Sequence, residues 1–508
     1  MKKTVFIKNA LILTVSSLIL RFAGIIFKVW LASLIGSEGI GLYQLVFSVY
    51  VLAATYATSG ISTAVTRLTA EEMAVGSKRG TLKILRRCLE LTLLIALITV
   101  IILFFGADFI AKTVLGDARA AIALKILPFS LPFMGISSCL KGYFIAARRA
   151  SPNAISQIFE QLVRILIVVF LLKNSLSKGL AYCCGAVLFG DVVAEGLSCI
   201  MLAVIFFKQK KNLNRSSGRA RPPYKILSKI LHISVPITSG RYLNTALRTA
   251  ENILVPKNLA KYPKSGDTAL SQFGMIKGMA LPILFFPSTL LNSISTLLIP
   301  EMSEASAKNQ KWLVKSATEN ILSLTAVVSF IFSAIFLVAG DRVGMLIYKS
   351  PDVGFLLKAL SPIVPLMYLD SISDGILKGL DQQLFSFRTA ISDSVIRIVM
   401  ILCVLPLTGL YGFIGIMYFS NLLTCLLNVG RLLKISKAKI NFTKIILIPI
   451  LTAFSVTLLC ETLISLFNIH SNLYFLIILC VVCIPVYLFF MLAFGALEKE
   501  YFLRFFKK

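Results

Sequence analysis

The sequence has few of the residues that enzymes use for chemistry. It contains only two histidines, His232 and His470, which lie far apart and in no metal-binding motif. It has no Gly-Lys-Ser/Thr phosphate-binding loop, so nothing indicates that ATP drives the protein directly. It also lacks a long polar stretch that could fold into a soluble catalytic domain, the longest being about Lys208–Lys225. These absences argue against an enzyme and predict neither a metal nor a cofactor.

The ten cysteines are the other reactive residues, and their spacing fits no disulfide framework or metal-binding motif. Nearly all lie inside apolar runs, where a thiol behaves as a small hydrophobic side chain. We interpret them as core residues.

Long hydrophobic runs dominate the chain. Hydrophobic residues make up 57% of it and the mean hydropathy is +0.86, which is typical of a polytopic membrane protein. A transmembrane helix needs roughly 20 apolar residues. The sequence predicts an all-α protein with about fourteen transmembrane helices, at residues 9–35, 40–66, 86–106, 121–147, 155–173, 179–207, 227–255, 269–299, 316–338, 356–380, 390–408, 411–433, 444–466 and 472–495.

The charge is strongly one-sided. The 52 Lys and Arg outnumber the 23 Asp and Glu and give a net charge of +29, which could suggest a nucleic-acid partner. The basic residues, however, cluster in alternate loops, as in cytoplasmic loops of multi-pass membrane proteins. We therefore predict no nucleic-acid partner, a place in the cell membrane, both termini in the cytoplasm, and contact with anionic lipid headgroups. The clusters are Lys2–Lys3, Lys78–Arg87, Arg148–Arg149, Lys208–Lys225, Lys308–Lys315, Arg431–Lys444 and Arg504–Lys508.

Identical residues recur at one fixed offset. Gly41 and Gly274 are 233 residues apart (274 − 41), and so are Arg164 and Arg397. An offset that holds over about a hundred residues indicates an internal duplication. Each half has six spans, an even number, so both halves insert in the same orientation as a parallel repeat. The other pairs are Ile61-Ser62-Thr63 with Ile294-Ser295-Thr296, Glu71 with Glu304, Asp108 with Asp341, Pro132 with Pro365 and Gly142 with Gly375.

The duplication predicts the domain organisation. Residues 1–207 form a six-helix lobe, 208–226 a basic cytoplasmic linker, 227–434 a second six-helix lobe, and 435–508 two extra transmembrane helices with a basic tail. Two paired lobes around a cleft at the middle of the membrane are what an alternating-access transporter needs. A channel would more often show a filter loop or a ring built from several subunits, and we see neither.

Four cations lie within the predicted spans. Arg21 and Lys28 are seven residues apart on span one, and Arg241 and Arg248 are seven apart on span seven, so each pair shares one helix face. A cation at the middle of the membrane costs at least about 2.5–3.5 kcal/mol, so these side chains should face a wet cavity rather than lipid. Such a cavity would bind an anion such as a phosphate group, with Glu251 partly neutralising Arg248. The alternatives are pairing with buried acids and snorkelling to the surface.

Acids and bases also pair within helices. Glu160 with Arg164 and Asp393 with Arg397 are repeat-related pairs four residues apart, which favours structural ion pairs over coupling sites. An acid inside a span can also bind a coupling proton or cation. The other candidates are Asp370 and Asp374, beside Lys378, on span ten, and Asp191 and Glu195 on span six.

Span eight is interrupted by helix-weakening residues. Gly274 and Gly278 precede Pro282, Pro287 and Pro300. Proline removes a helical hydrogen bond and permits a kink. We expect a bending span there, which suits either a gate or a static kink.

Two segments carry a family resemblance. The run Leu281-Pro282-Ile283-Leu284-Phe285-Phe286-Pro287-Ser288, continued by Leu298-Ile299-Pro300-Glu301-Met302-Ser303-Glu304-Ala305, resembles polysaccharide-biosynthesis flippases of the stage V sporulation protein B type. So does Ile35-Gly36-Ser37-Glu38-Gly39-Ile40-Gly41-Leu42-Tyr43. The resemblance covers essentially the whole chain. It implies the multidrug/oligosaccharidyl-lipid/polysaccharide exporter superfamily, whose flippases are two six-helix lobes that move undecaprenyl-linked sugars.

The resemblance also implies site residues. In the lipid II flippases, arginines on spans one, two and eight, with basic residues on span seven, line a cationic cavity. Arg21 matches on span one, Arg67 is a weaker match on span two, and Arg241 and Arg248 lie on span seven, but span eight offers Lys277 instead of arginine. The drug-antiporter branch usually carries an acid in span one, and this chain has none there.

The sequence therefore predicts a flippase for an anionic undecaprenyl-linked oligosaccharide, serving the cell wall or spore cortex, with cell-wall synthases as further partners and a monomeric state. One alternative is a cation-coupled drug or metabolite antiporter of the same fold. The other is a non-transporting membrane scaffold for cell-wall synthesis, which would not need buried cations.

Overall fold

The computed structural model describes residues 3–75, 78–213, 224–262, 268–466 and 471–495. Every regular element within these ranges is a helix. Ten of the helices are long and apolar enough to cross a membrane. The chain is therefore a polytopic all-α membrane protein, as the sequence predicts.

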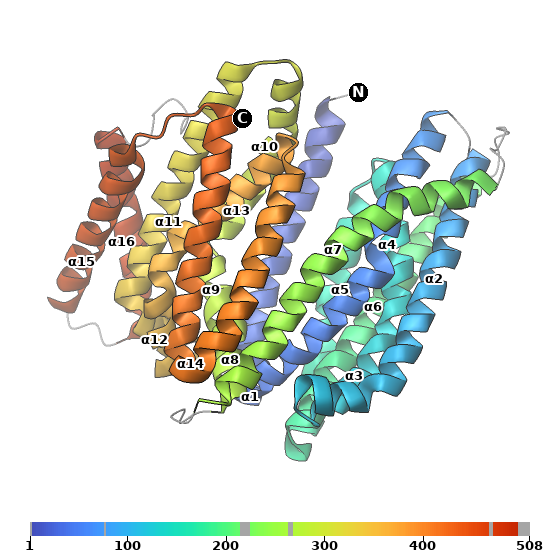
Figure 1. Cartoon of the computed structure of the whole chain (residues 1–508), viewed down its shortest axis with the longest axis horizontal. Coiled ribbons are helices and arrows are strands. Elements are labelled where there is room, and N and C mark those ends of the chain that lie inside the picture. Colours follow the sequence, from blue (N-terminus) through green and yellow to red (C-terminus); the bar gives the residue numbers. More distant parts are fainter. Residues whose placement is uncertain (1–2, 76–77, 214–223, 263–267, 467–470, 496–508) are drawn as a thin grey trace. The chain divides into compact units, whose positions relative to one another are not determined.

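Two of the helices are too long for one crossing. Helix α1 (Lys3–Ala74) has 72 residues, which would span about 108 Å at 1.5 Å per residue, over three times the ~30 Å hydrocarbon core. It is broken at Gly36, where φ is 69° and ψ is −179°. Helix α14 (Gln383–Ser436) is broken likewise at Gly409, with φ of 60°; Figure 1 shows its two orange legs. Only glycine adopts such backbone angles readily, so each helix contains two of the predicted spans.

The contacts divide the chain into two compact units, residues 1–257 and 258–508. The core of unit 1 joins apolar side chains of α1, α2, α4, α6 and α7, including Val65, Cys88, Phe144 and Leu202. Its elements are α1, α2 (Lys78–Phe109), the π-helix η1 (Ile110–Leu115), α3 (Ala120–Ile126), η2 (Leu127–Phe129), α4 (Ser130–Ala146), α5 (Ser151–Ser175), η3 (Leu176–Lys178), α6 (Leu180–Leu213) and α7 (Tyr224–Leu259).

The core of unit 2 packs the two C-terminal helices against α11. The Tyr487 hydroxyl donates to the Val327 carbonyl at 3.1 Å, and the Arg342 guanidinium lies 3.4 Å from the centre of the Phe475 ring. The elements are α8 (Ala269–Phe273), the π-helix η4 (Gly274–Ala280), α9 (Leu281–Phe285), α10 (Ser288–Ala307), α11 (Lys311–Tyr348), α12 (Pro351–Leu360), η5 (Ser361–Ile363), α13 (Val364–Gly379), α14, the π-helix η6 (Thr443–Leu447), α15 (Ile448–Leu466) and α16 (Asn472–Ala493).

The duplication is visible inside the two units. Gly116 (φ 78°) and Lys349 (φ 52°) are both left-handed residues at the end of a helix, and they differ in number by the offset of 233. Arg148 (φ 58°) and Asp381 (φ 60°) repeat the match. Matching ion pairs follow the same offset, Asp108 with Lys125 and Asp341 with Lys358. The two halves of the chain therefore repeat one internal architecture.

Helix α7 belongs to unit 1 by its contacts, because the division falls after Lys257. The predicted boundary lies earlier, in the linker 208–226, most of which is outside the described residues. The two divisions have different bases, since one follows the repeat and the other follows packing. By packing, the cations of span one and span seven lie in the same unit.

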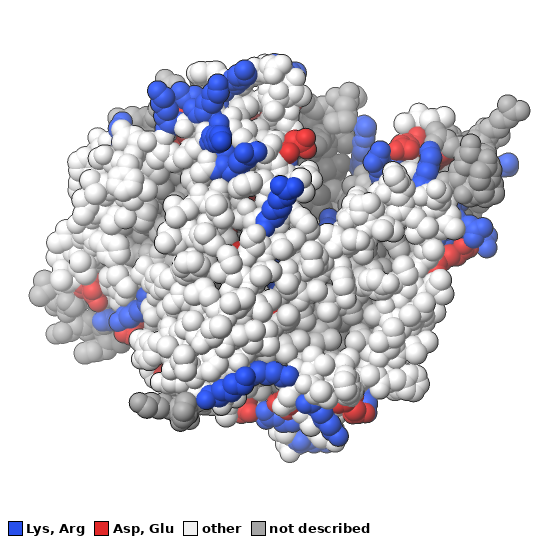
Figure 2. Space-filling model, viewed as in Figure 1, with Lys and Arg blue, Asp and Glu red and all other residues white. Residues whose placement is uncertain are grey.

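Charged side chains concentrate at the helix ends. On the face shown in Figure 2, most Lys, Arg, Asp and Glu lie at the two ends of the helices, with few in the band between. That band matches a hydrocarbon environment, in which an exposed charge is costly.

Candidate functional site

Helix α7 packs antiparallel along the second leg of α1, residues 37–74. Near one end, Thr249 Oγ1 donates to the Ser48 carbonyl at 3.1 Å and Asn252 Nδ2 donates to Ser48 Oγ at 3.0 Å. Further along, the Tyr56 and Tyr242 rings lie 5.8 Å apart. The Gly60 backbone N–H donates to Thr238 Oγ1 at 3.1 Å. These contacts hold α7 against α1 over much of its length.

Glycine is required at one point of this contact. A Cβ added to Gly60 would lie 2.2 Å from the Ser234 carbonyl oxygen, which belongs to the backbone of α7 and cannot move alone. The close approach fixes how α7 presents its other faces.

Arg241 and Arg248 lie on one flank of α7, beside the face that meets α1. Each precedes a residue of that face, Tyr242 or Thr249, and both arginine side chains are exposed. Within the part of the chain that the structure describes, neither guanidinium has an ion-pair or hydrogen-bond partner. A cation that lies inside a transmembrane helix and has no carboxylate partner must face water or an anionic ligand.

The cations of span one lie on the first leg of α1, which ends at Gly36. Arg21 is exposed and Lys28 is half-buried. The guanidinium of Arg21 likewise has no partner among the described residues. Arg21 is therefore exposed and without a partner among the described residues, and its role in binding an anion stays a prediction.

Two other predicted site residues are engaged differently. Arg67 lies near the C-terminal end of the second leg and pairs with Glu71 at 3.4 Å, with 67% of its side chain exposed. Glu251 is buried on α7. Arg67 is thus partly neutralised, which makes it a weaker candidate than Arg21.

Arg164 on α5 is the centre of a buried ion network in unit 1. Its Nη2 donates to Glu160 Oε1 at 2.9 Å, the pair that the sequence predicts. Its Nε lies 2.6 Å from Asp191 Oδ1 on α6, a close ion contact without hydrogen-bond alignment. Lys141 Nζ on α4 approaches Glu160 Oε2 at 3.9 Å. The network ties α4, α5 and α6 together, which supports a structural role for Arg164.

The repeat-related pair in unit 2 is simpler. Arg397 Nη2 donates to Asp393 Oδ2 at 2.9 Å and to Ser420 Oγ at 2.6 Å, and Ser420 in turn donates to Asp393. In unit 2 the Ser420 hydroxyl is thus the second partner of the arginine, whereas in unit 1 that partner is the Asp191 carboxylate. These three groups join the two legs of α14.

The acids of span ten also have partners. Asn428 Nδ2 donates to Asp370 Oδ1 at 2.7 Å, and Asp374 pairs with Lys378 four residues later. With the offset of 233, Asn428 corresponds to Glu195 of unit 1, so the two units place an amide and a carboxylate at matching positions. The buried carboxylates of Asp191 and Glu195 are therefore particular to unit 1.

Span eight is interrupted as the sequence predicts. Gly274 and Gly278 lie in the π-helix η4, Pro282 lies in the first turn of α9, and Pro287 precedes α10. The side chain of Lys277, within η4, lies 5.9 Å from the centre of the Phe413 ring. Short π-helices often occur at functional sites. The gating role of these residues stays a prediction.

Sequence reasoning missed the partners that come from distant elements. It did not anticipate Lys141, Ser420 or Asn428 as members of the ion networks. The offset of 233 was the only signal for these residues in the sequence. It aligns Lys141 with Asp374 and Glu195 with Asn428, so it marks both pairs of positions as polar in each half of the chain.

Comparisons with known proteins agree with this architecture. The family model described as "Polysaccharide biosynthesis protein" matches residues 6–263. Stage V sporulation protein B of Bacillus subtilis (strain 168) is 27% identical over 91% of this chain and 89% of its own length. The lipid II flippase MurJ of the same organism is 22% identical over 78% of this chain and 76% of its own length.

Solved structures share the fold. Lipid II flippase MurJ in an inward closed conformation superposes with a TM-score of 0.71, at 15% identity, over 94% of this chain and 98% of that one. An inward-facing multidrug resistance MATE family transporter of the MOP superfamily gives a TM-score of 0.67, at 14% identity, over 83% and 96%. The chain belongs to the polysaccharide biosynthesis protein family, and it shares its fold with these flippases and transporters.

Proposed function

We propose that the protein is a flippase that moves an anionic undecaprenyl-linked oligosaccharide, lipid II-like or a polysaccharide repeat unit, across the cytoplasmic membrane by alternating access. It would serve the synthesis of the cell wall or the spore cortex. The similarity to stage V sporulation protein B and to a lipid II flippase supports this class of substrate.

One observation carries the proposal. Arg21 lies in a helix apolar enough to span a membrane, Arg241 and Arg248 lie on the less apolar helix α7, and all three residues are exposed and have no side-chain partner among the described residues. An unpaired cation inside a membrane span would destabilise the protein unless water or an anion solvates it. Three of them on two helices of one unit therefore favour an anionic ligand.

The substrate explains why cations are needed. A pyrophosphate headgroup would lose its hydration in hydrocarbon, which is prohibitive without compensating charges. Arginine replaces that hydration well, because its planar guanidinium forms two parallel hydrogen bonds to phosphate oxygens. The polyprenyl tail would stay in lipid, beside α15 and α16.

The test is complementation in a bacterial strain depleted of its own lipid II flippases. Arg21→Ala and Arg248→Ala should abolish growth while the protein still accumulates in the membrane. Arg86→Ala is the matched control, because Arg86 is 82% exposed at the end of α2 and pairs with Glu90. Full growth with both site variants would refute the cationic site.

A drug or metabolite antiporter is the second candidate, and the buried carboxylates of Asp191 and Glu195 favour it, since acids inside a span can carry a coupling proton. The two functions separate in one assay. An antiporter would confer drug resistance that is lost in Asp191→Asn, without rescuing a flippase-depleted strain. A scaffold would keep its function in the Arg21→Ala and Arg248→Ala variants.

A further inference from the structure

The contact between α7 and the second leg of α1 has a polar flank. On α7, Arg241, Thr245, Arg248 and Asn252 recur at intervals of four, three and four residues, so they form one stripe along the helix. All four are exposed or half-buried. The two arginines are about 10.5 Å apart along the helix axis, with Thr245 between them. The stripe therefore places a hydroxyl group between two cations.

Hydroxyl groups of the two helices meet at the middle of this flank. Thr245 Oγ1 lies 3.5 Å from Thr55 Oγ1 on the second leg of α1. Further along, Asn252 Nδ2 donates to Ser48 Oγ at 3.0 Å. Thr55 and Thr245 are both half-buried, so a ligand that lies on the flank can reach them. We call these two residues the threonine pair.

The threonine pair offers acceptors to a ligand. Thr55 Oγ1 donates its proton to the Val51 carbonyl at 2.7 Å, and Thr245 Oγ1 donates to the Arg241 carbonyl at 2.9 Å. A hydroxyl has one proton and two lone pairs, so each threonine keeps lone pairs for another group. A guanidinium is the reverse, because it only donates. Along the flank, a pair of acceptors thus lies between two sets of donors.

A phosphate group alone matches only part of this pattern. Its oxygens accept hydrogen bonds, which suits the arginines but not the threonine pair. Sugar hydroxyls and the N–H of an N-acetyl group can donate, which suits the threonine pair. The matching ligand therefore carries an anionic group with a sugar attached to it.

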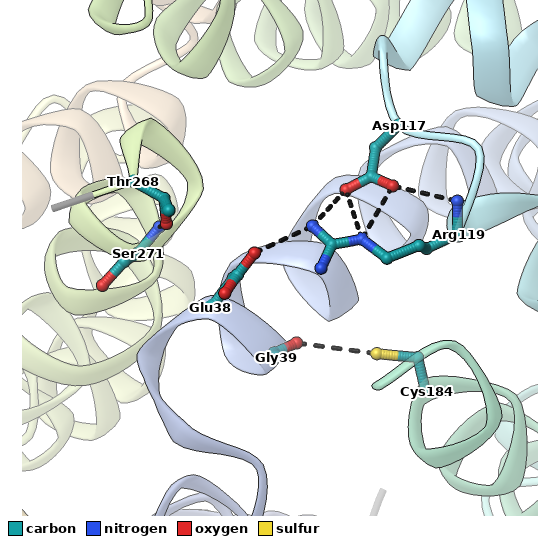
Figure 3. Close-up of polar contacts among 7 residues, drawn as sticks. All are labelled: Glu38, Gly39, Asp117, Arg119, Cys184, Thr268 and Ser271. Atoms are coloured by element: carbon teal, nitrogen blue, oxygen red, sulfur yellow. Dashed lines mark hydrogen bonds and ion pairs between the residues drawn. The ribbon is translucent and has the colours of Figure 1, made fainter. Parts of the chain in front are cut away.

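The helices that carry the flank are held to neighbouring segments. At the start of the second leg, the Arg119 guanidinium donates to Glu38 Oε1 at 2.9 Å and to both carboxylate oxygens of Asp117 at 2.7–3.1 Å (Figure 3). Burial alone would raise the pKa of Asp117, but its hydrogen bonds with Arg119 and the guanidinium charge together lower it. Lys257 Nζ, near the end of α7, donates to the Thr113 carbonyl at 2.9 Å. A site fixed in this way binds a ligand at a lower cost in entropy.

The duplication does not reproduce the polar stripe. Since span seven repeats span one, the offset of 233 gives each stripe residue a counterpart in the first span. Three of the four counterparts are apolar. Packing in the repeated architecture therefore does not require these polar side chains, which favours a role in binding. The counterparts of Arg241, Thr245, Arg248 and Asn252 are Lys8, Ile12, Val15 and Ile19.

We propose that this flank is the subsite that recognises the sugar of the lipid-linked substrate. Arg241 and Arg248 bind the phosphate oxygens, and the threonine pair accepts hydrogen bonds from the sugar attached to them. The inference rests on the proposed function, because it places two parts of that substrate on named residues. Its consequence is discrimination: the protein binds the glycosylated carrier more tightly than the bare carrier that remains after the sugars are transferred.

Two lipids test the subsite directly. Native mass spectrometry of the full chain in phosphatidylcholine nanodiscs would measure the affinity for undecaprenyl pyrophosphate and for the same lipid carrying N-acetylglucosamine. The parent chain should bind the glycosylated lipid about tenfold more tightly, as expected from two neutral hydrogen bonds. Thr55→Val combined with Thr245→Val should remove this preference and leave the affinity for undecaprenyl pyrophosphate unchanged. Arg241→Ala should instead weaken the binding of both lipids equally.

Matched variants separate recognition from packing. Thr99→Val combined with Thr452→Val is the control, because both hydroxyls also donate to the carbonyl four residues earlier but lie on α2 and α15. This control should keep the preference. Thr55→Ser combined with Thr245→Ser retains the hydroxyls and should keep it too. The preference is a ratio of two affinities of one protein, so a partly unfolded sample does not change it.

Three results would contradict the proposal. Equal affinity of the parent chain for the two lipids, or equal weakening of both lipids in the threonine-to-valine variant, would overturn the sugar subsite and leave the proposed function standing. Displacement of the glycosylated lipid by phosphatidylglycerol, whose headgroup also joins hydroxyls to a phosphate, would assign the flank to ordinary phospholipid and overturn it as well. Binding of neither polyprenyl lipid by the parent chain would contradict the proposed function itself.

Discussion

Removal of Arg164 should destabilise the protein more than removal of its repeat counterpart, Arg397. In Arg164→Met, the carboxylates of Glu160 and Asp191 lose a shared cation that lies 2.9 and 2.6 Å from them. Asp191 and Glu195 are each only 8% exposed, so water cannot replace that charge. Lys141, at 3.9 Å from Glu160, is left to balance them.

The expected loss in the free energy of unfolding follows from the number of carboxylates that are left without a cation. Breaking a buried ion pair by removing one partner costs about 3–5 kcal/mol. In Arg397→Met only Asp393 is stranded, and Ser420 still donates a hydrogen bond to it. Losing a hydrogen bond to a charged group costs about 1.5–3 kcal/mol. We therefore expect Arg164→Met to lower the free energy of unfolding by roughly 2 kcal/mol more than Arg397→Met.

The assay is reversible unfolding in mixed micelles of dodecyl maltoside and SDS, followed by tryptophan fluorescence or circular dichroism. Asp191→Asn in the Arg164→Met background should recover part of the loss, because it removes one stranded charge. Equal losses for the two arginine variants, together with additive effects of Arg164→Met and Asp191→Asn, would show that the network does not hold α5 against α6.

Three other outcomes follow from the same reasoning. Arg21→Lys should complement poorly compared with the parent chain, because lysine cannot form the bidentate contact with phosphate, and growth equal to the parent would contradict that contact. Asp117→Asn should lower thermal stability at pH 7, because the Asp117 carboxylate, whose pKa is lowered, contributes stability only while it is charged. The difference in thermal stability between variant and parent should disappear as pH falls below the ordinary aspartate pKa of 3.8. A difference that is unchanged at low pH would refute the stabilising ion pair between Asp117 and Arg119. Cysteines placed at Asn214 and Phe506 should resist impermeant thiol reagents in intact cells, whereas labelling from outside would refute the predicted topology.

The spans were predictable because each is set by a local pattern. An apolar run of about 20 residues is long enough to cross the membrane as a helix, so the runs predict the helices. The breaks at Gly36 and Gly409 fell between predicted spans, since a helix cannot continue through both crossings. Local spacing also predicted the pairs Glu160–Arg164 and Asp393–Arg397, because residues four apart share a helix face.

The long-range partners were not predictable from local pattern. Asp191 joins Arg164 from a neighbouring helix, and Glu38 joins Arg119 across 81 residues of sequence. Such pairs depend on how helices pack, and neither spacing nor periodicity encodes that. The pair Arg67–Glu71, by contrast, was available from local spacing, because the two residues are four apart on one helix.

The most direct test of the account is the lipid that the protein retains. Mass spectrometry of lipids that co-purify with the full chain, extracted in mild detergent, should detect a polyprenyl pyrophosphate carrying sugars. The Arg21→Ala and Arg248→Ala variants should lose most of it, and Arg86→Ala should keep it. Phospholipids alone on the parent chain, or equal retention of the glycolipid by all four proteins, would contradict a cationic site for an anionic lipid-linked glycan.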